Sequence, residues 1–149
     1  NFCVRRGVEL ETVIDWRGIP AVSARAFKEM ELSVLPPSER TRVFHSSGTG
    51  GMIPSRHFHN ETSLALYKQS ILPGFQWHMS IASGCKPLML FLIPEPARAP
   101  HSSLAHMAGC IQDNLAAENS VFAVKPNSNG EWILDLGLQP ILARLLMPL

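Results

Sequence analysis

Hydroxyl-bearing residues and glycines follow one another in one short segment of the sequence, Ser46-Ser47-Gly48-Thr49-Gly50-Gly51. Glycine allows positive φ angles and lets a ligand approach the backbone closely. Serine and threonine add hydroxyl donors, and successive backbone N–H groups in such a turn form a concave site that suits phosphate. The segment therefore predicts a phosphate-binding loop, although many glycine- and serine-rich turns bind no ligand.

The common nucleotide-binding motifs are missing around this segment. It lacks the Gly-Lys-Ser/Thr ending of the P-loop, and the chain has no Gly-x-Gly-x-x-Gly fingerprint. The nearest cation downstream is Arg56. Its guanidinium either helps to neutralise an anion held by the loop or is an ordinary surface charge.

Histidines and cysteines offer weaker alternatives. His57 and His59 are two residues apart, with His45 nearby, but no cysteine or carboxylate cluster accompanies them at metal-ligand spacing. We therefore expect polar strand positions rather than a metal site. Cys85 and Cys110 are expected to be buried structural residues, because a nucleophilic cysteine needs a base beside it.

Strands and helices alternate around the loop, which indicates an α/β fold with a mixed or parallel sheet and flanking helices. Strands are expected at 42–45 and 56–59 on either side of the loop, at the apolar run 88–93, and at 121–124 with a hairpin return over 132–136. The run 88–93 is expected to be buried on both faces, as in a covered parallel sheet.

Capping residues predict where the helices begin. Asn60 caps a helix that runs through Tyr67 towards Met79, with a kink or break at Pro73-Gly74. Ser102 or Ser103 caps a helix ending near Leu115. A short strand or helix is expected within 1–18, ending at Gly18. Ser23 is expected to cap a short helix over 24–30, and 32–35 is expected to be extended. A last helix is expected from Gln139-Pro140.

Composition limits the classes of partner. The chain has 149 residues, 46% hydrophobic and 17% charged, with a net charge of +1. No run of like charges reaches five, so we expect no nucleic-acid partner. The three cysteines do not suggest a disulfide framework, which favours a cytoplasmic location. The longest apolar run is far shorter than the roughly 20 residues of a membrane helix, so we do not expect the chain to span a membrane.

The loop and its neighbours resemble the adenylate-forming superfamily of acyl-CoA synthetases and luciferases. Residues 46–51 are similar to the Ser-Ser-Gly-Thr-Thr-Gly phosphate loop of that superfamily, with Gly50 in place of its second threonine. The acyl-protein synthetase branch, which contains long-chain-fatty-acid–protein ligases, is the most similar. This similarity covers about residues 14–79 and includes Ile19-Pro20-Ala21-Val22, Ala26-Phe27-Lys28, Pro54-Ser55-Arg56-His57-Phe58 and Ser63-Leu64-Ala65-Leu66-Tyr67.

The resemblance implies an ATP-dependent reaction. A carboxylate such as a fatty acid would form an acyl-adenylate, with Mg²⁺ as cofactor, and the acyl group would pass to the thiol of an acceptor protein. Ser46, Ser47, Gly48, Thr49, Gly50 and Gly51 would hold the phosphates, with Arg56 nearby. Residues 1–149 would be part of the large N-terminal AMP-binding domain, without the C-terminal domain and its catalytic lysine, and we expect this part to be inactive alone.

Two other interpretations stay open at this point. A phenylacetate-type acyl-CoA ligase would share the first half-reaction and use CoA as the acceptor. A non-catalytic module that kept the loop and lost nucleotide binding would account for Gly50, because the hydroxyl of the family threonine is missing there.

Overall fold

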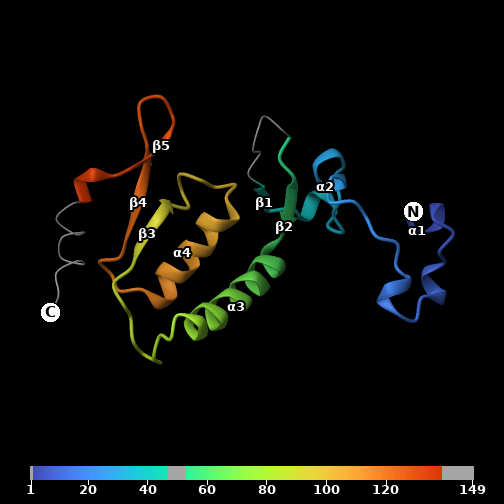
Figure 1. Ribbon diagram of the computed structural model, residues 1–149, viewed down its shortest axis with the longest axis horizontal. Helices are drawn as coiled ribbons and strands as arrows, with labels where there is room; N and C mark the ends of the chain where they lie inside the picture. Colours follow the sequence, from blue (N-terminus) through green and yellow to red (C-terminus); the bar gives the residue numbers. More distant parts are fainter. Residues whose placement is uncertain (1, 47–52, 139–149) are drawn as a thin grey trace.

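The computed structural model describes residues 2–46 and 53–138, which form a mixed α/β fold (Figure 1). The described residues include the helices α1 (Phe2–Arg5), α2 (Ala26–Glu29), α3 (Glu61–His78) and α4 (Ser103–Leu115), and the strands β1 (Arg42–His45), β2 (Arg56–His59), β3 (Leu90–Pro94), β4 (Val121–Pro126) and β5 (Trp132–Leu134). Short 3-10 turns occur at Leu10–Thr12, Trp16–Gly18, Pro37–Glu39 and Leu136–Leu138. The expected α/β class is therefore confirmed at this level.

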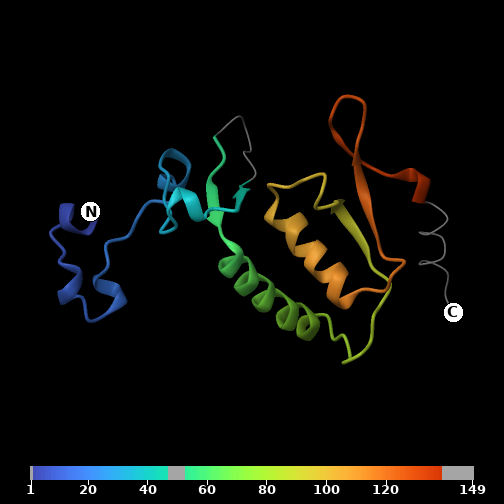
Figure 2. The same cartoon turned by 180° about the vertical axis from the view of Figure 1, so that it is seen from behind.

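The strands form two separate small sheets. β1 and β2 make an antiparallel pair, whereas β3, β4 and β5 make a mixed sheet in that order. β3 and β4 are parallel and are joined through α4, while β4 and β5 form the expected antiparallel hairpin. Both views show α3 and α4 between the two sheets, with residues 2–30 at the far end of the molecule from β5 (Figures 1 and 2).

The strand predicted within 88–93 is present, but the expectation that it is buried on both faces is wrong. Leu92 is 64% exposed, and the other β3 residues are only half-buried. Within the described sheet, β3 is an edge strand with β4 as its neighbour on one side. A strand therefore stays exposed when too few elements cover it, however apolar its sequence is.

Helix α4 is the most deeply buried helix of the described chain. Ser102 is its N-cap, and the Ser102 hydroxyl accepts a hydrogen bond of 3.1 Å from the backbone N–H of Ala105. Ala105, Ala108 and Ile111 are buried on its inner face. Gly109 lies so close to Pro96 that a Cβ would stand 2.7 Å from the proline ring, so a larger residue would push the helix from the connection that precedes it.

Helix α3 begins where Asn60 predicts. The Asn60 side chain accepts a bond from the Ser63 N–H, and the Ser63 hydroxyl accepts one from the Asn60 N–H. Of the kink or break predicted at Pro73-Gly74, the break is wrong, because the helix continues to His78. Proline removes a single N–H donor, and packing of α3 against α4 retains the turns on both sides of it.

The N-terminal part of the chain contains only short helical turns. Residues 2–18 form α1 and two 3-10 turns, and the second of these turns ends at Gly18, where a short strand or helix was predicted to end. The short helix predicted within 24–30 is present as α2, but the Ser23 cap is wrong: α2 begins at Ala26 with Arg25 as its N-cap, and the Ser23 hydroxyl accepts from the Arg25 N–H instead. Residues 32–35 join no described sheet, and the helix predicted from Gln139-Pro140 lies outside the described residues.

The capping box of α3 generates a stability prediction. Asn60→Ala should lower the free energy of unfolding by about 1 kcal/mol, because an orphan helix N–H loses its acceptor. Chemical denaturation followed by circular dichroism measures the change. Gln69→Ala, an exposed substitution on the same helix, should have almost no effect; equal losses in the two variants would contradict a capping role.

Candidate functional site

The β1–β2 pair holds both ends of the predicted phosphate loop. Its register places Phe44 opposite His57 and His45 opposite Arg56. Ser46 and Arg56 therefore lie at the base of the loop. The other predicted loop residues, Ser47, Gly48, Thr49, Gly50 and Gly51, lie outside the described residues, so their roles stay predictions.

Two serines close the base of the loop. The Ser46 N–H donates to the Ser55 carbonyl over 3.1 Å, and the Ser55 N–H donates to the Ser46 hydroxyl oxygen over 2.9 Å. Ser55 is only 7% exposed, and its hydroxyl lies 2.9 Å from Nε2 of His57. Because the Ser46 hydroxyl uses its oxygen as an acceptor, its proton is available to donate to an anion.

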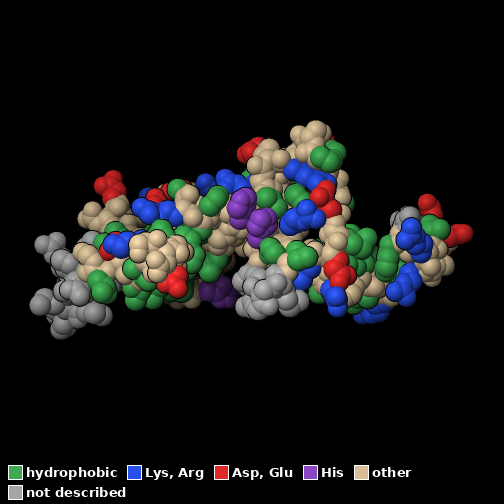
Figure 3. All heavy atoms as spheres, turned by 90° about the horizontal axis from the view of Figure 1, so that it is seen from above, with side chains coloured by type: hydrophobic (Ala, Val, Ile, Leu, Met, Phe, Trp, Pro, Cys, Tyr) green, Lys and Arg blue, Asp and Glu red, His purple; other side chains and the backbone are tan. Residues whose placement is uncertain are grey.

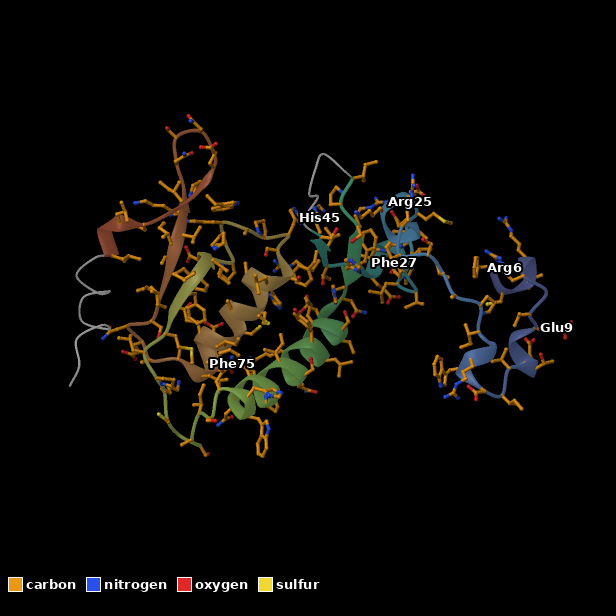
Figure 4. The ribbon with its side chains drawn as sticks, in the orientation of Figure 1. Arg6, Glu9, Arg25, Phe27, His45 and Phe75 are labelled. Atoms are coloured by element: carbon orange, nitrogen blue, oxygen red, sulfur yellow. The ribbon has the colours of Figure 1, made fainter. Side chains whose placement is uncertain are left out.

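A segment far along the sequence binds the outer edge of β1. The His45 N–H donates to the His101 carbonyl over 2.8 Å, while His101 Nδ1 lies 3.1 Å from the Val43 carbonyl. Since a carbonyl oxygen only accepts, His101 Nδ1 carries the proton. The two imidazole rings stack with centroids 4.6 Å apart. In Figure 4, His45 lies on the side of β1 that faces the connection leading into α4.

This histidine pair was not identified as a functional element from the sequence. His101 lies in the turn before α4, and nothing in the local sequence pattern indicates that it contacts β1. The Arg42 guanidinium adds a third link by donating to the Pro100 carbonyl over 3.3 Å. Residues 100–101 therefore lie beside β1, joined to it by the backbone bond from His45 and by the side-chain bonds of His101 and Arg42.

Two cavities open at the base of the loop, and His45 and Ser46 line both of them. One, of about 470 Å³, is completed by the connection before α4, including Arg98, His101 and Ser102. The other, of about 320 Å³, lies against Phe44, His57 and Tyr67. Histidine, arginine and hydroxyl donors thus surround the loop base, and Figure 3 shows histidine side chains beside Lys and Arg side chains on one face.

Two histidines near the loop base have lowered pKa values. Partial burial, the nearby charge of His101 and that of Arg56 lower the pKa of His45 below its ordinary value of 6.5. Burial and the nearby His57 lower the pKa of His59 in the same way. These rings are therefore mainly neutral at pH 7, and a bound anion would favour their protonation.

Arg56 is exposed, and it forms an ion pair with a neighbour. Its guanidinium lies 3.5 Å from Glu31 and stands over the Phe58 ring at 5.8 Å. The structure thus shows Arg56 beside the loop and partly exposed, which leaves its role towards an anion as a prediction.

The remaining histidines and cysteines occupy other environments. His57 stacks on Phe27 with centroids 5.9 Å apart, and His59 Nδ1 lies 3.2 Å from the Ser63 hydroxyl. Among the described residues, no group of three or more His, Cys, Asp or Glu side chains is arranged to hold a metal ion. The expectation that Cys85 is buried is wrong, because it is exposed; Cys110 is half-buried, 3.8 Å from His106 Nε2.

A larger, apolar cavity lies away from the loop. Its volume is about 760 Å³, and it is bounded by β3, by the C-terminal end of α3 and by Met107 and Ile111 of α4. Helix α4 connects the two regions, because its first residue, Ser103, lines the smaller cavity beside Phe44.

In the described part of the chain, no helix is both long and apolar enough to cross a membrane.

The ring cluster under the hairpin generates a pH prediction. Phe44, buried to 3% exposure, contacts the rings of His59, Tyr67 and His106. Burial lowers the pKa of His59 and of His106. The unfolded chain therefore binds these protons more readily, so stability should fall as pH drops below about 6.5 towards the lower folded-state values.

Thermal melts between pH 5 and 8 measure this dependence. His106→Phe should flatten it, because it keeps a ring in the cluster and removes one titrating group. Tyr67→Phe is the matched control and should leave the slope unchanged, because burial raises the pKa of Tyr67 above 10, outside this range. An unchanged slope in His106→Phe would contradict the assignment.

The comparisons with known proteins assign no family to this chain. The geometry at the loop base is set by Ser46, Ser55, His45, His101 and Arg56. No protein-family model matches this chain, and neither the curated proteins nor the solved structures include a match to it.

Proposed function

We propose that this chain forms the phosphate-binding part of an enzyme that activates a carboxylate with ATP. The observation that carries the proposal is the closed base of the loop. Ser46 and Ser55 bring the two ends of a glycine- and hydroxyl-rich segment together between two strands. A short loop fixed at both ends can present its N–H groups to one anion, which is the geometry that phosphate binding requires.

The charges around the loop base support an anionic ligand. Arg56 and Arg98 are the nearby cations, and Ser46 retains a hydroxyl proton to donate. The rings of His45 and His101 line the same cavity, and a neighbouring phosphate would favour the charged form of His45. A carboxylate side chain is absent from the described lining of both cavities at the loop base.

The proposed reaction has two steps. A carboxylate oxygen attacks the α-phosphorus of ATP, the bond to the bridging oxygen breaks, and pyrophosphate leaves. The thiol of an acceptor protein then attacks the acyl carbon and releases AMP. The protein's part in the first step is to hold the phosphates and stabilise the charge that develops on their oxygens. Mg²⁺ would supply further neutralisation, and we assign it no ligand among the described residues.

The apolar cavity supports a fatty acid as the carboxylate. Its volume of about 760 Å³ and its lining by β3, Phe75, Met107 and Ile111 suit an alkyl chain. Helix α4 spans the distance between this cavity and the loop base, so an acid could place its chain in one and its carboxylate near the other.

ATP binding to the chain tests the proposal. Isothermal titration with ATP and Mg²⁺ should detect binding that a Ser47→Ala/Thr49→Ala variant weakens at least tenfold, because each lost hydroxyl bond to a charged phosphate is worth about 1.5 kcal/mol or more. Thr12→Ala/Ser70→Ala is a matched control, since both of these hydroxyls make exposed local bonds elsewhere.

The control variant should bind ATP as tightly as the unmodified chain. Equal affinity in all three proteins would show that the loop is not the phosphate site. A complete lack of ATP binding by the folded chain would contradict the proposal for this part of the protein.

A further inference from the structure

Glu31 lies between two arginines whose environments differ. One carboxylate oxygen pairs with Arg40 and the other lies 3.5 Å from Arg56. Both guanidinium groups stand over the same ring, that of Phe58, at 4.3 Å for Arg40 and 5.8 Å for Arg56. Glu31 comes from the segment before β1, so this cluster joins that segment to the outer face of the hairpin.

Arg40 is held firmly in this cluster. Its side chain is only 15% exposed, its Nε donates to the Leu35 carbonyl over 2.9 Å, and its guanidinium packs closely on Phe58. The hydrogen bond from Arg40 is also the main reason why the pKa of Glu31 lies below its ordinary value. Arg40 therefore has a structural role and keeps the Glu31 carboxylate paired even when Arg56 moves away.

Arg56 is held much less firmly. Its side chain is 43% exposed, and its contacts with Glu31 and Phe58 are both longer than those of Arg40. An exposed ion pair of this kind contributes little, so it is easily exchanged. Arg56 also directly follows Ser55 and lies opposite His45, which places it at the base of the loop. Its charge already acts there, since it contributes to the lowered pKa of His45.

We propose that Glu31 competes with a phosphate ligand for Arg56 and so sets the affinity of the loop base for anions. When an anion binds beside Ser46, Arg56 leaves Glu31 and pairs with the anion, while Arg40 keeps the Glu31 carboxylate paired. Arg56 is a binding residue in this arrangement, and Glu31 is a positioning residue that acts through it. The inference rests on the proposed phosphate site and adds the residue that tunes it.

Inorganic pyrophosphate at low ionic strength is the probe. Glu31→Gln should bind it roughly two- to fivefold more tightly than the unmodified chain, the range expected for release of one exposed ion pair. The gain should vanish in an Arg56→Gln background, because the two changes act through the same contact. Glu29→Gln is the matched control: it removes the same charge from an exposed glutamate paired with Arg25 and should leave the affinity unchanged.

A second measurement needs no substitution. NMR signals of the guanidinium groups should show that pyrophosphate shifts Arg56 and leaves Arg40 in place. If Glu31→Gln destabilises the fold because Arg40 loses its partner, a thermal melt will show the loss of stability. The NMR readout on the unmodified chain then still tests the proposal.

The outcomes separate this inference from the proposed function. Pyrophosphate binding that Glu31→Gln leaves unchanged, or a gain that persists without Arg56, overturns the competition and leaves the phosphate site intact. An Arg56 signal that does not respond to bound pyrophosphate also overturns it. No binding by either the unmodified chain or the folded Glu31→Gln variant overturns the phosphate site and, with it, this inference.

Discussion

The candidate site depends on β1 being hydrogen-bonded along both of its edges. β2 pairs with one edge, and on the other edge the His45 N–H donates to the His101 carbonyl and the His101 ring bonds to the Val43 carbonyl. A two-stranded hairpin alone is at best marginally stable in water. Here Phe44 is buried among rings from α3 and α4, so the strand is fixed by packing as well as by hydrogen bonds. The position of Ser46 follows directly from these contacts.

The electrostatic character of the loop base follows from the same packing. Burial keeps His45 and His59 mainly neutral, whereas Arg56 and Arg98 stay charged at the edge of the site. A site of this kind attracts anions without carrying a cluster of permanently charged groups in its interior. The Glu31 carboxylate is paired with Arg40 and Arg56 and is absent from the described lining of the two cavities at the loop base.

Features with local causes could be predicted from the sequence, and features with distant causes could not. Asn60 and Ser102 were recognisable as helix caps because each bonds to a residue three positions away. The strands around the loop were recognisable from their own pattern. Exposure of Leu92 depends on which elements cover β3, and continuation of α3 through Pro73 depends on its packing against α4. The His45–His101 contact joins residues with no common local signal, so the histidine pair became visible only in the fold.

The bond between His101 and Val43 spans 58 residues of sequence, and this separation has a consequence for the order of folding. The β3–α4–β4 unit is closed by contacts such as that between Met89 and Ser120, 31 residues apart, whereas the outer edge of β1 must wait for a longer loop to close. During synthesis, the hairpin leaves the ribosome well before the residues that complete its edge. The phosphate-loop base is therefore expected to be among the last parts of the molecule to reach its final geometry.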